Sequence, residues 1–169
     1  YTNSVVERTL DDLPDGDLLI KVSYSSLNYK DALSASGNPG VTRNFPHTPG
    51  IDAVGEVAQS NSSNFKEGDK VIVTGYDLGM NTSGGFSEFI RIPSSWAIQL
   101  PTKLSELDSM CLGTAGLTAG LSIYALDSFQ GISNTRSIVT GSTGGVGSIS
   151  VMLLAKLGSE VTALSGKSD

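Results

Sequence analysis

The chain of 169 residues contains 38% hydrophobic and 17% charged residues, a balance typical of a globular protein that can bury a core. Its 17 acidic and 11 basic residues give a net charge of −6 without a block of like charge, which argues against binding to nucleic acid or anionic lipid. One cysteine, Cys111, and one histidine, His47, exclude an intrachain disulfide and are too few to form a structural zinc site.

The first hundred residues show the patterns of short β-strands. Over residues 18–24 apolar and polar side chains alternate, which is the period of a half-buried strand. Further strands are predicted at 52–58, 70–74 and 86–92, separated by loops rich in Gly, Ser, Asn and Pro. We therefore expect an all-β region.

The pattern changes after Pro101. An acidic turn near Ser105 predicts the start of a helix. A short apolar strand at 137–141, a helix at 146–157 and a strand at 160–166 follow. These last three elements form one βαβ unit of about the usual 30 residues.

No apolar run approaches the ~18 residues of a membrane span, the longest being 151–155. We therefore expect no membrane partner, and the single unpaired thiol makes a reducing, cytoplasmic compartment the expectation. Because the chain begins at Tyr1 rather than at Met, the possibility that a targeting peptide has been removed stays open.

The stretch "VTGSTGGVGSIS", residues 139–150, joins the predicted strand to the predicted helix. Glycine permits a tight turn and a close backbone approach, and a helix N-terminus favours an anion. The spacing of Gly141, Gly144 and Gly147 is G-x-x-G-x-x-G rather than the stricter G-x-G-x-x-G. We expect a dinucleotide phosphate site, and the alternative is a connection whose glycines serve packing alone.

The last predicted strand ends in Ser165, Gly166 and Lys167 and offers no carboxylate to a ribose 2′-hydroxyl. A 2′-phosphate would gain charge-assisted hydrogen bonds there, which favours NADPH over NADH. The alternative for Lys167 is an ordinary solvated lysine.

Four motifs carry a resemblance to a known family: "SLNYKDAL", "FPHTPGIDAVGEV", "GTAGLTAG" and "VTGSTGGVGS". In this order they resemble the medium-chain dehydrogenase/reductase superfamily, and within it the branch of quinone oxidoreductases and acryloyl-CoA reductases. The resemblance implies an α/β plus β fold, in which a GroES-like β-barrel domain precedes a Rossmann domain. We assign residues 1–104 to the first domain. Residues 105–169 would form a connecting helix and the first βαβ unit of an NADP-binding domain that is truncated here, and we expect a homodimer when the chain is complete.

The resemblance also implies a binding site for NADP(H) between the two domains. Tyr29 would approach the cofactor from the barrel side and Thr118 would lie near the nicotinamide. The remaining implied contacts are Thr143, Gly144, Gly145 and Val146 with the pyrophosphate, and Ser165, Gly166 and Lys167 with the 2′-phosphate.

Zinc-dependent members of the superfamily bind a catalytic metal through cysteine and histidine. At the corresponding positions this chain has Asn28, Ile51 and Thr114, which do not suit Zn²⁺, so we expect no metal. Asp52 is then expected to bond neighbouring polar groups. For His47 and Cys111 we prefer structural roles, as a loop histidine and a small buried side chain on a helix.

Without a metal, hydride transfer to an activated alkene or a quinone is still feasible, because the cofactor supplies the hydride. Asn28, Tyr29 and Asp31 could orient the nicotinamide and pass a proton. For Asn28 and Asp31 the alternative is to brace the loop after the first strand. The predicted function is an NADPH-dependent oxidoreductase acting on a small molecule, namely acryloyl-CoA, an enone or a quinone. A non-catalytic NADPH-binding sensor or crystallin-like protein is the alternative.

Substrate preference stays open, because Thr82 and Ser83 stand where relatives often have His-Trp.

Overall fold

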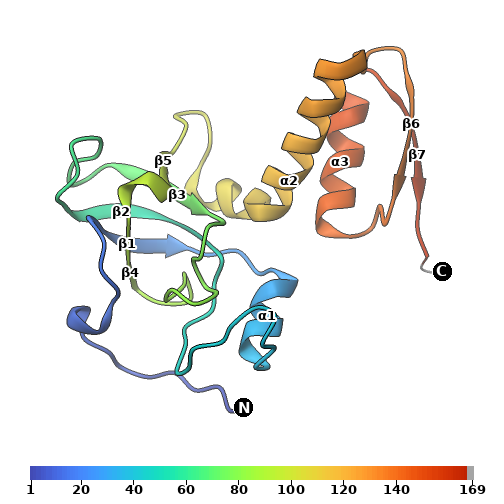
Figure 1. The fold of residues 1–169 in the computed structure, drawn as a ribbon. Helices are drawn as coiled ribbons and strands as arrows, with labels where there is room; N and C mark the ends of the chain where they lie inside the picture. Colours follow the sequence, from blue (N-terminus) through green and yellow to red (C-terminus); the bar gives the residue numbers. More distant parts are fainter. Residues whose placement is uncertain (167–169) are drawn as a thin grey trace. The chain divides into compact units, whose positions relative to one another are not determined.

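The computed structural model describes residues 1–166, which divide into two compact units, Tyr1–Gly113 and Thr114–Asp169 (Figure 1). The first turns of the connecting helix therefore belong to the first unit, whereas the sequence assigned the whole helix to the second domain. The first unit contains β1 (Leu18–Tyr24), α1 (Tyr29–Ala35), β2 (Asp52–Ser60), β3 (Lys70–Thr74), β4 (Phe89–Ile92) and β5 (Ala97–Gln99), with short 3-10 helices at Leu10–Asp12 and Ser94–Trp96.

The five strands form one antiparallel sheet in the order β4-β1-β2-β3-β5. Successive residues of a strand are buried on opposite faces of this sheet. In β3, Val71 and Val73 join the larger core, whereas Ile72 packs with Met110 on the other face. The larger core consists of Leu18, Ile20, Ala53, Val57, Val71, Val73, Leu78, Ile90, Ile92 and Ala97. The all-β expectation for this region is confirmed, apart from the short helices.

Two local predictions differ from the structure. The strand predicted at 86–92 begins only at Phe89, because the N–H of Phe86 donates to the carbonyl of Pro49 instead of joining the sheet. The segment after β1, predicted as a loop, contains α1. Seven residues are too few to show a helical hydrophobic period.

The second unit contains the part of α2 (Glu106–Gln130) that follows Gly113, then β6 (Arg136–Thr140), α3 (Gly145–Lys156) and β7 (Glu160–Leu164). β6 and β7 are parallel, as the predicted βαβ unit requires. Figure 1 shows α3 beside this strand pair and α2 alongside α3. Their common core is formed by Ile123, Ile132 and Leu154 with Val139, Leu153 and Val161.

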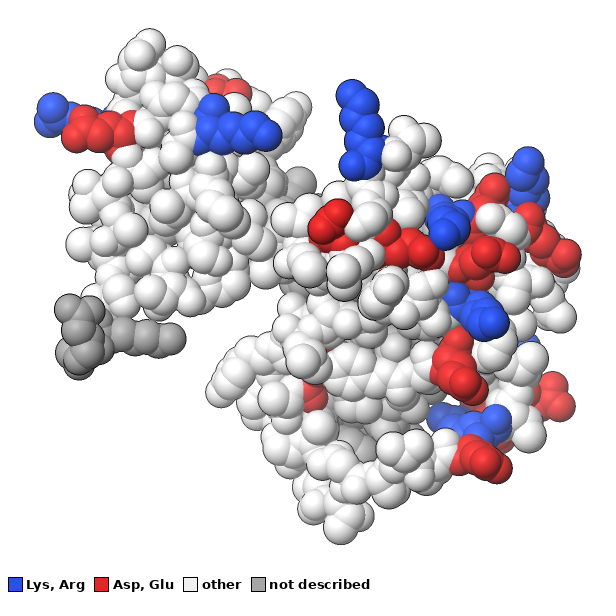
Figure 2. Space-filling view, turned by 180° about the vertical axis from the view of Figure 1, so that it is seen from behind, with Lys and Arg blue, Asp and Glu red and all other residues white. Residues whose placement is uncertain are grey.

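The strand pair remains partly uncovered, since Ile138 is 69% and Leu164 49% exposed. Charged side chains are few in residues 114–166, namely Asp127, Arg136, Lys156 and Glu160. In the first unit Lys and Arg alternate with Asp and Glu over the face drawn in Figure 2. No single sign of charge dominates that face.

Among residues 1–166, α2 is the one helix that by length and composition could cross a membrane. It is interrupted, however, because Gly113 has non-helical dihedral angles (φ 48°, ψ −152°). The continuous part at 114–130 is shorter than the ~20 apolar residues of a typical membrane span. The sequence analysis considered only uninterrupted apolar runs. It therefore did not predict that α2 as a whole is long and apolar enough to meet this criterion.

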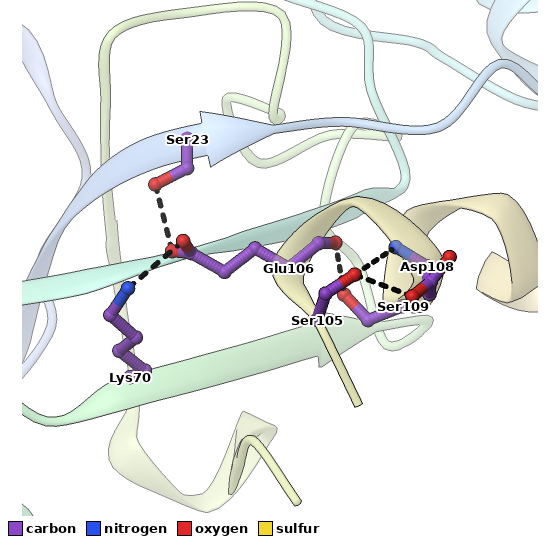
Figure 3. Close-up of polar contacts among 6 residues, drawn as sticks. All are labelled: Ser23, Lys70, Ser105, Glu106, Asp108 and Ser109. Atoms are coloured by element: carbon purple, nitrogen blue, oxygen red, sulfur yellow. Dashed lines mark hydrogen bonds and ion pairs between the residues drawn. The ribbon is translucent and has the colours of Figure 1, made fainter. Parts of the chain in front are cut away.

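The first turn of α2 is attached to the sheet by Glu106 (Figure 3). Its carboxylate accepts hydrogen bonds from the Ser23 hydroxyl of β1 (2.9 Å) and from the Lys70 ammonium of β3 (3.0 Å). Ser105 caps the helix by accepting the N–H of Asp108 (3.0 Å). The hydrogen bond from Lys70, and secondly that from Ser23, holds the pKa of Glu106 below its ordinary value, against the opposing effect of burial.

Replacing Glu106 by Gln should destabilise the first unit by about 0.5–1 kcal/mol at pH 7, since the ion pair is partly exposed to solvent. The folded-state pKa lies below the unfolded value of about 4.3. The contribution of the carboxylate is therefore present above that pH and is lost as the pH falls through the lower, folded value.

Thermal unfolding of the wild type and of Glu106→Gln between pH 7 and pH 3 measures this difference. Glu67→Gln, at an exposed turn residue, controls for the loss of one negative charge. A difference between Glu106→Gln and the wild type that stays constant down to pH 3 would contradict the assignment.

Candidate functional site

The segment between β1 and α1 is held in place by the buried carboxylate of Asp31. Its Oδ2 accepts the N–H of Asn28 (2.7 Å), and its Oδ1 accepts the N–H groups of Gly50 (3.1 Å) and Ile51 (3.0 Å). Asp31 thereby joins the N-terminus of α1 to the start of β2. This geometry supports the bracing alternative for Asp31 over proton transfer.

A second buried carboxylate, Asp52, lies at the centre of a cluster that we call the Asp52 cluster, made of Ser25, Ser26, Asn28 and Asp52. The Oδ2 of Asp52 accepts hydrogen bonds from the Ser26 hydroxyl and from the Asn28 Nδ2 (2.9 Å). Asn28 Nδ2 also donates to Ser26 Oγ (3.0 Å), and Ser25 Oγ donates to the Asp52 carbonyl (2.6 Å). The expectation that Asp52 bonds neighbouring polar groups is confirmed.

Gly113 packs directly on the Asp52 cluster. A Cβ at this position would lie 2.7 Å from Asp52 Oδ2 and 2.9 Å from Ser26 Oγ. Its positive φ is also a conformation that side-chain-bearing residues rarely adopt. The backbone can therefore approach the carboxylate only with glycine at this position.

Tyr29 differs from its two neighbours in the predicted catalytic set. It is 81% exposed, and its hydroxyl has no hydrogen-bond partner within residues 1–166. Asn28 is half-buried, and its Nδ2 donates to Ser26 Oγ and Asp52 Oδ2, whereas Asp31 is buried. Of the three, Tyr29 presents the most exposed hydrogen-bond donor.

In the second unit, the glycine-rich turn joins β6 to the N-terminus of α3. Gly141 has a positive φ of 62° and accepts the N–H of Gly144 (3.0 Å), which is the N-cap of α3. A Cβ on Gly147 would overlap the Gly141 carbonyl, so this glycine serves packing. The first N–H bonded within the helix is that of Ser148, to Gly144. The preceding N–H groups at the helix start have no carbonyl one turn earlier to bond, as at any helix N-terminus.

The end of β7 lies beside this turn, because Ser142 donates to the Leu164 carbonyl through both its N–H (3.1 Å) and its hydroxyl (2.9 Å). Thr143, Gly144, Gly145 and Val146 on the turn are exposed, and so are Ser165 and Gly166 after β7. These predicted contacts thus gather at one edge of the strand pair. Lys167 lies outside the described residues.

Three further predicted residues have simple placements. Thr118 is exposed on α2 and donates to the carbonyl of Thr114 (2.7 Å). His47 bonds the Gly79 carbonyl through Nε2 (2.9 Å), as a loop histidine would. Cys111 is exposed, so the prediction of a buried side chain is wrong. Its neighbour Met110 faces the sheet instead, and successive helix residues point in different directions.

Sequence reasoning missed Ser26 and Gly113 as members of the site region. Ser26 is one of two adjacent serines after β1, and nothing local marks which of them reaches a carboxylate. Gly113 was visible only as the first residue of "GTAGLTAG". Within residues 1–166, no group of three or more His, Cys, Asp or Glu side chains is placed to hold a metal ion.

Comparison with known proteins gives the family. Residues 14–102 match the model of the alcohol dehydrogenase GroES-like domain. Acrylyl-CoA reductase AcuI of Ruegeria pomeroyi is 40% identical over 166 residues, which cover 97% of this chain and 50% of that protein. Other curated relatives are named as quinone oxidoreductases, for example a chloroplastic homologue from Spinacia oleracea at 34% identity over 169 residues.

Solved structures agree with this relationship. The YhdH oxidoreductase of Salmonella enterica, in complex with NADP, is 44% identical with a TM-score of 0.92, covering 97% of this chain and 51% of that one. The YhfP protein of Bacillus subtilis, with NAD bound, is 45% identical with a TM-score of 0.84, covering 92% of this chain and 48% of that one. The chain spans about half the length of the relatives that it matches. The chain belongs to the medium-chain dehydrogenase/reductase superfamily of oxidoreductases, in the branch of quinone oxidoreductases and acrylyl-CoA reductases, with a GroES-like domain followed by the start of a Rossmann domain.

Proposed function

We propose that the protein transfers a hydride from NADPH to an activated alkene, such as acryloyl-CoA or an enone, or to a quinone, without zinc. The observation that carries this proposal is the glycine-rich turn, where the N-terminus of α3 lies beside the end of β7, whose described residues Ser165 and Gly166 carry no carboxylate. Relatives of 40–46% identity that are named quinone oxidoreductase or acrylyl-CoA reductase support the reaction class. Solved relatives with NADP or NADPH bound support the cofactor.

In the second unit, the proposed contacts are electrostatic. The N–H groups around Gly145 and Val146 would bind the pyrophosphate, helped by the positive end of the α3 dipole. Ser165, Gly166 and Lys167 would bind the 2′-phosphate. The other proposed cofactor contacts are Tyr29, Thr118, Thr143 and Gly144.

The bound nicotinamide supplies the hydride, and the protein must supply a donor to the oxygen on which negative charge develops. Tyr29 is the best placed of the predicted catalytic residues, because its hydroxyl is exposed and uncommitted. Asp31 positions this segment through its three backbone hydrogen bonds. We assign the same kind of supporting role to Asn28, through its contacts with Ser26 and Asp52.

The absence of zinc from the mechanism is supported by the residues at the metal positions of the zinc-dependent members. Asn28 faces Asp52 with its amide nitrogen, which cannot bind a cation. Ile51 offers no ligand atom in its side chain. We also propose a small-molecule substrate, a cytoplasmic location and a homodimer, the last to be tested by light scattering of the complete gene product.

The function is tested with the complete gene product, NADPH and a panel of acryloyl-CoA, small enones and quinones. Turnover with deuterium from the 4-position of labelled NADPH appearing on a substrate carbon identifies an alkene reductase. A semiquinone signal in electron spin resonance identifies one-electron quinone reduction instead. Binding of NADPH without its consumption on any substrate would refute the enzyme and favour a non-catalytic binder.

Replacing Tyr29 by Phe should lower kcat by about 10–100-fold, because the variant loses the hydroxyl that serves the reacting oxygen. The dissociation constant for NADPH should change far less, since the ring remains. Steady-state kinetics and a fluorescence titration separate the two effects. If kcat is unchanged, Tyr29 has no role as a donor.

Replacing Lys167 by Glu should weaken NADPH binding by at least about tenfold, equivalent to about 1.4 kcal/mol. NADH binding should not weaken, because NADH has no 2′-phosphate to repel. The variant should therefore prefer NADH to NADPH. The comparison of the two cofactors is relevant because the Bacillus subtilis relative was solved with NAD bound. Lys66→Glu, the same charge change at an exposed turn of the first unit, is the control. Equal losses for both cofactors, or none, would remove the role given to Lys167.

A further inference from the structure

Tyr76, just after β3, has a backbone conformation that disfavours a large side chain. Its φ is 55°, in the left-handed region, and the preceding Gly75 also has a positive φ of 83°. For a bulky residue this region is a strained outlier, and such outliers gather at ligand-binding sites. The strain persists only where contacts of the side chain or of the surrounding chain offset it.

Two contacts hold the ring of Tyr76. It stacks on the indole of Trp96, with the ring centroids 5.3 Å apart and the ring planes 6° from parallel. Its hydroxyl donates to the carbonyl of Ser95 at 3.2 Å. Trp96 is itself packed, partly buried, against the larger core of the first unit. The ring of Tyr76 is therefore held in one plane by a support that belongs to the core.

The opposite face of the Tyr76 ring is open. Tyr76 is 63% exposed, although Trp96 covers one face of the ring and Ser95 engages the hydroxyl. Such a high exposed fraction requires the second face to be largely free of contacts within residues 1–166. Because aromatic groups prefer offset stacking, a fixed ring with one open face is a surface suited to a second flat ring.

The loop that carries Tyr76 begins beside the candidate site of the first unit. The N–H of Gly75 donates to the carbonyl of Ile51 at 3.3 Å. The N–H of Ile51 in turn donates to the carboxylate of Asp31, which also fixes the start of the helix that carries Tyr29. The segments that present the rings of Tyr76 and Tyr29 are thus joined by a short series of hydrogen bonds.

We propose that Tyr76 is a specificity-determining residue, which stacks on the ring of a quinone substrate. This proposal rests on the proposed function and names the substrate class of the same site. The electron-poor ring of a quinone complements the electron-rich ring of tyrosine, and both are flat. Trp96 is then a positioning residue, because it acts through Tyr76.

The charges around Tyr76 favour a quinone over the other flat ring that the proposed substrates offer, the adenine of a CoA thioester. Residues 75–84 and 93–96 contain neither Lys nor Arg, and their one charged residue is Asp77. The adenine of CoA would bring phosphate groups close to this carboxylate without a cation from either segment. A quinone is neutral and meets no such repulsion.

The test measures the KM for menadione, a flat two-ring quinone, with the complete gene product and NADPH. Replacing Tyr76 by Leu keeps an apolar side chain but removes the ring. It should raise the KM for menadione about threefold to tenfold, the range expected for one aromatic pair. The KM for NADPH is the internal reference and should change by less than about twofold.

Three further variants separate stacking from a structural role. Tyr76→Phe keeps the ring and should keep the KM for menadione. Tyr76→Asn removes the ring but suits the left-handed backbone, and it should raise this KM as much as Tyr76→Leu does. Tyr124→Leu, the same change at an exposed tyrosine of α2, should leave it unchanged. A ring that only shields Trp96 would instead lower the melting temperature of Tyr76→Leu without raising the KM.

Three results would overturn the proposal and leave the proposed function intact. The first is an unchanged KM for menadione in both ring-free variants. The second is a wild type that reduces acryloyl-CoA or an enone but not menadione. The third is a raised KM for acryloyl-CoA with that for menadione unchanged, which would assign the ring to the adenine of CoA. A wild type that consumes NADPH on none of these substrates would refute the proposed function itself.

Discussion

The burial of the Asp52 carboxylate imposes the constraint on which the first unit depends. A buried charge is tolerated only when its hydrogen bonds are satisfied, and here the donors come from Ser26 and Asn28, just after β1. Meeting that requirement brings the end of β1 against the start of β2. Asp31 adds a second connection, to the backbone at Gly50 and Ile51. Two short polar segments that are distant in sequence are thus held together next to the exposed ring of Tyr29.

The elements with a clear hydrophobic period were predictable from the sequence. β1, β3 and the βαβ unit were placed to within one or two residues, because alternation and the strand-turn-helix pattern are local signals. α1 was missed because its seven residues show no helical hydrophobic period, although Asn28 and Asp31 form a capping box at its start. The strand β5 was missed because its three residues are too few to show the alternation of a strand.

The site was predictable to a different degree in each unit. In the second unit the glycines themselves encode the turn, and the structure brings Thr143 to Val146 beside Ser165 as expected. In the first unit the sequence identified Asn28, Tyr29 and Asp31 but not what distinguishes them. Whether a polar side chain faces solvent or a buried carboxylate depends on contacts across 24 residues of chain, and a single sequence does not contain that information.

Gly113 satisfies two unrelated requirements at once: a positive φ, and the space taken by Asp52 and Ser26. The first is a property of the residue's own backbone and the second a property of its neighbours. A change at Asp52 that opened space for a side chain would therefore leave the backbone conformation as unfavourable as before. Evolution by single steps cannot easily leave such a position, because no one compensating substitution repairs both defects. Within this branch, Gly113 should tolerate no other residue even where the surrounding cluster varies.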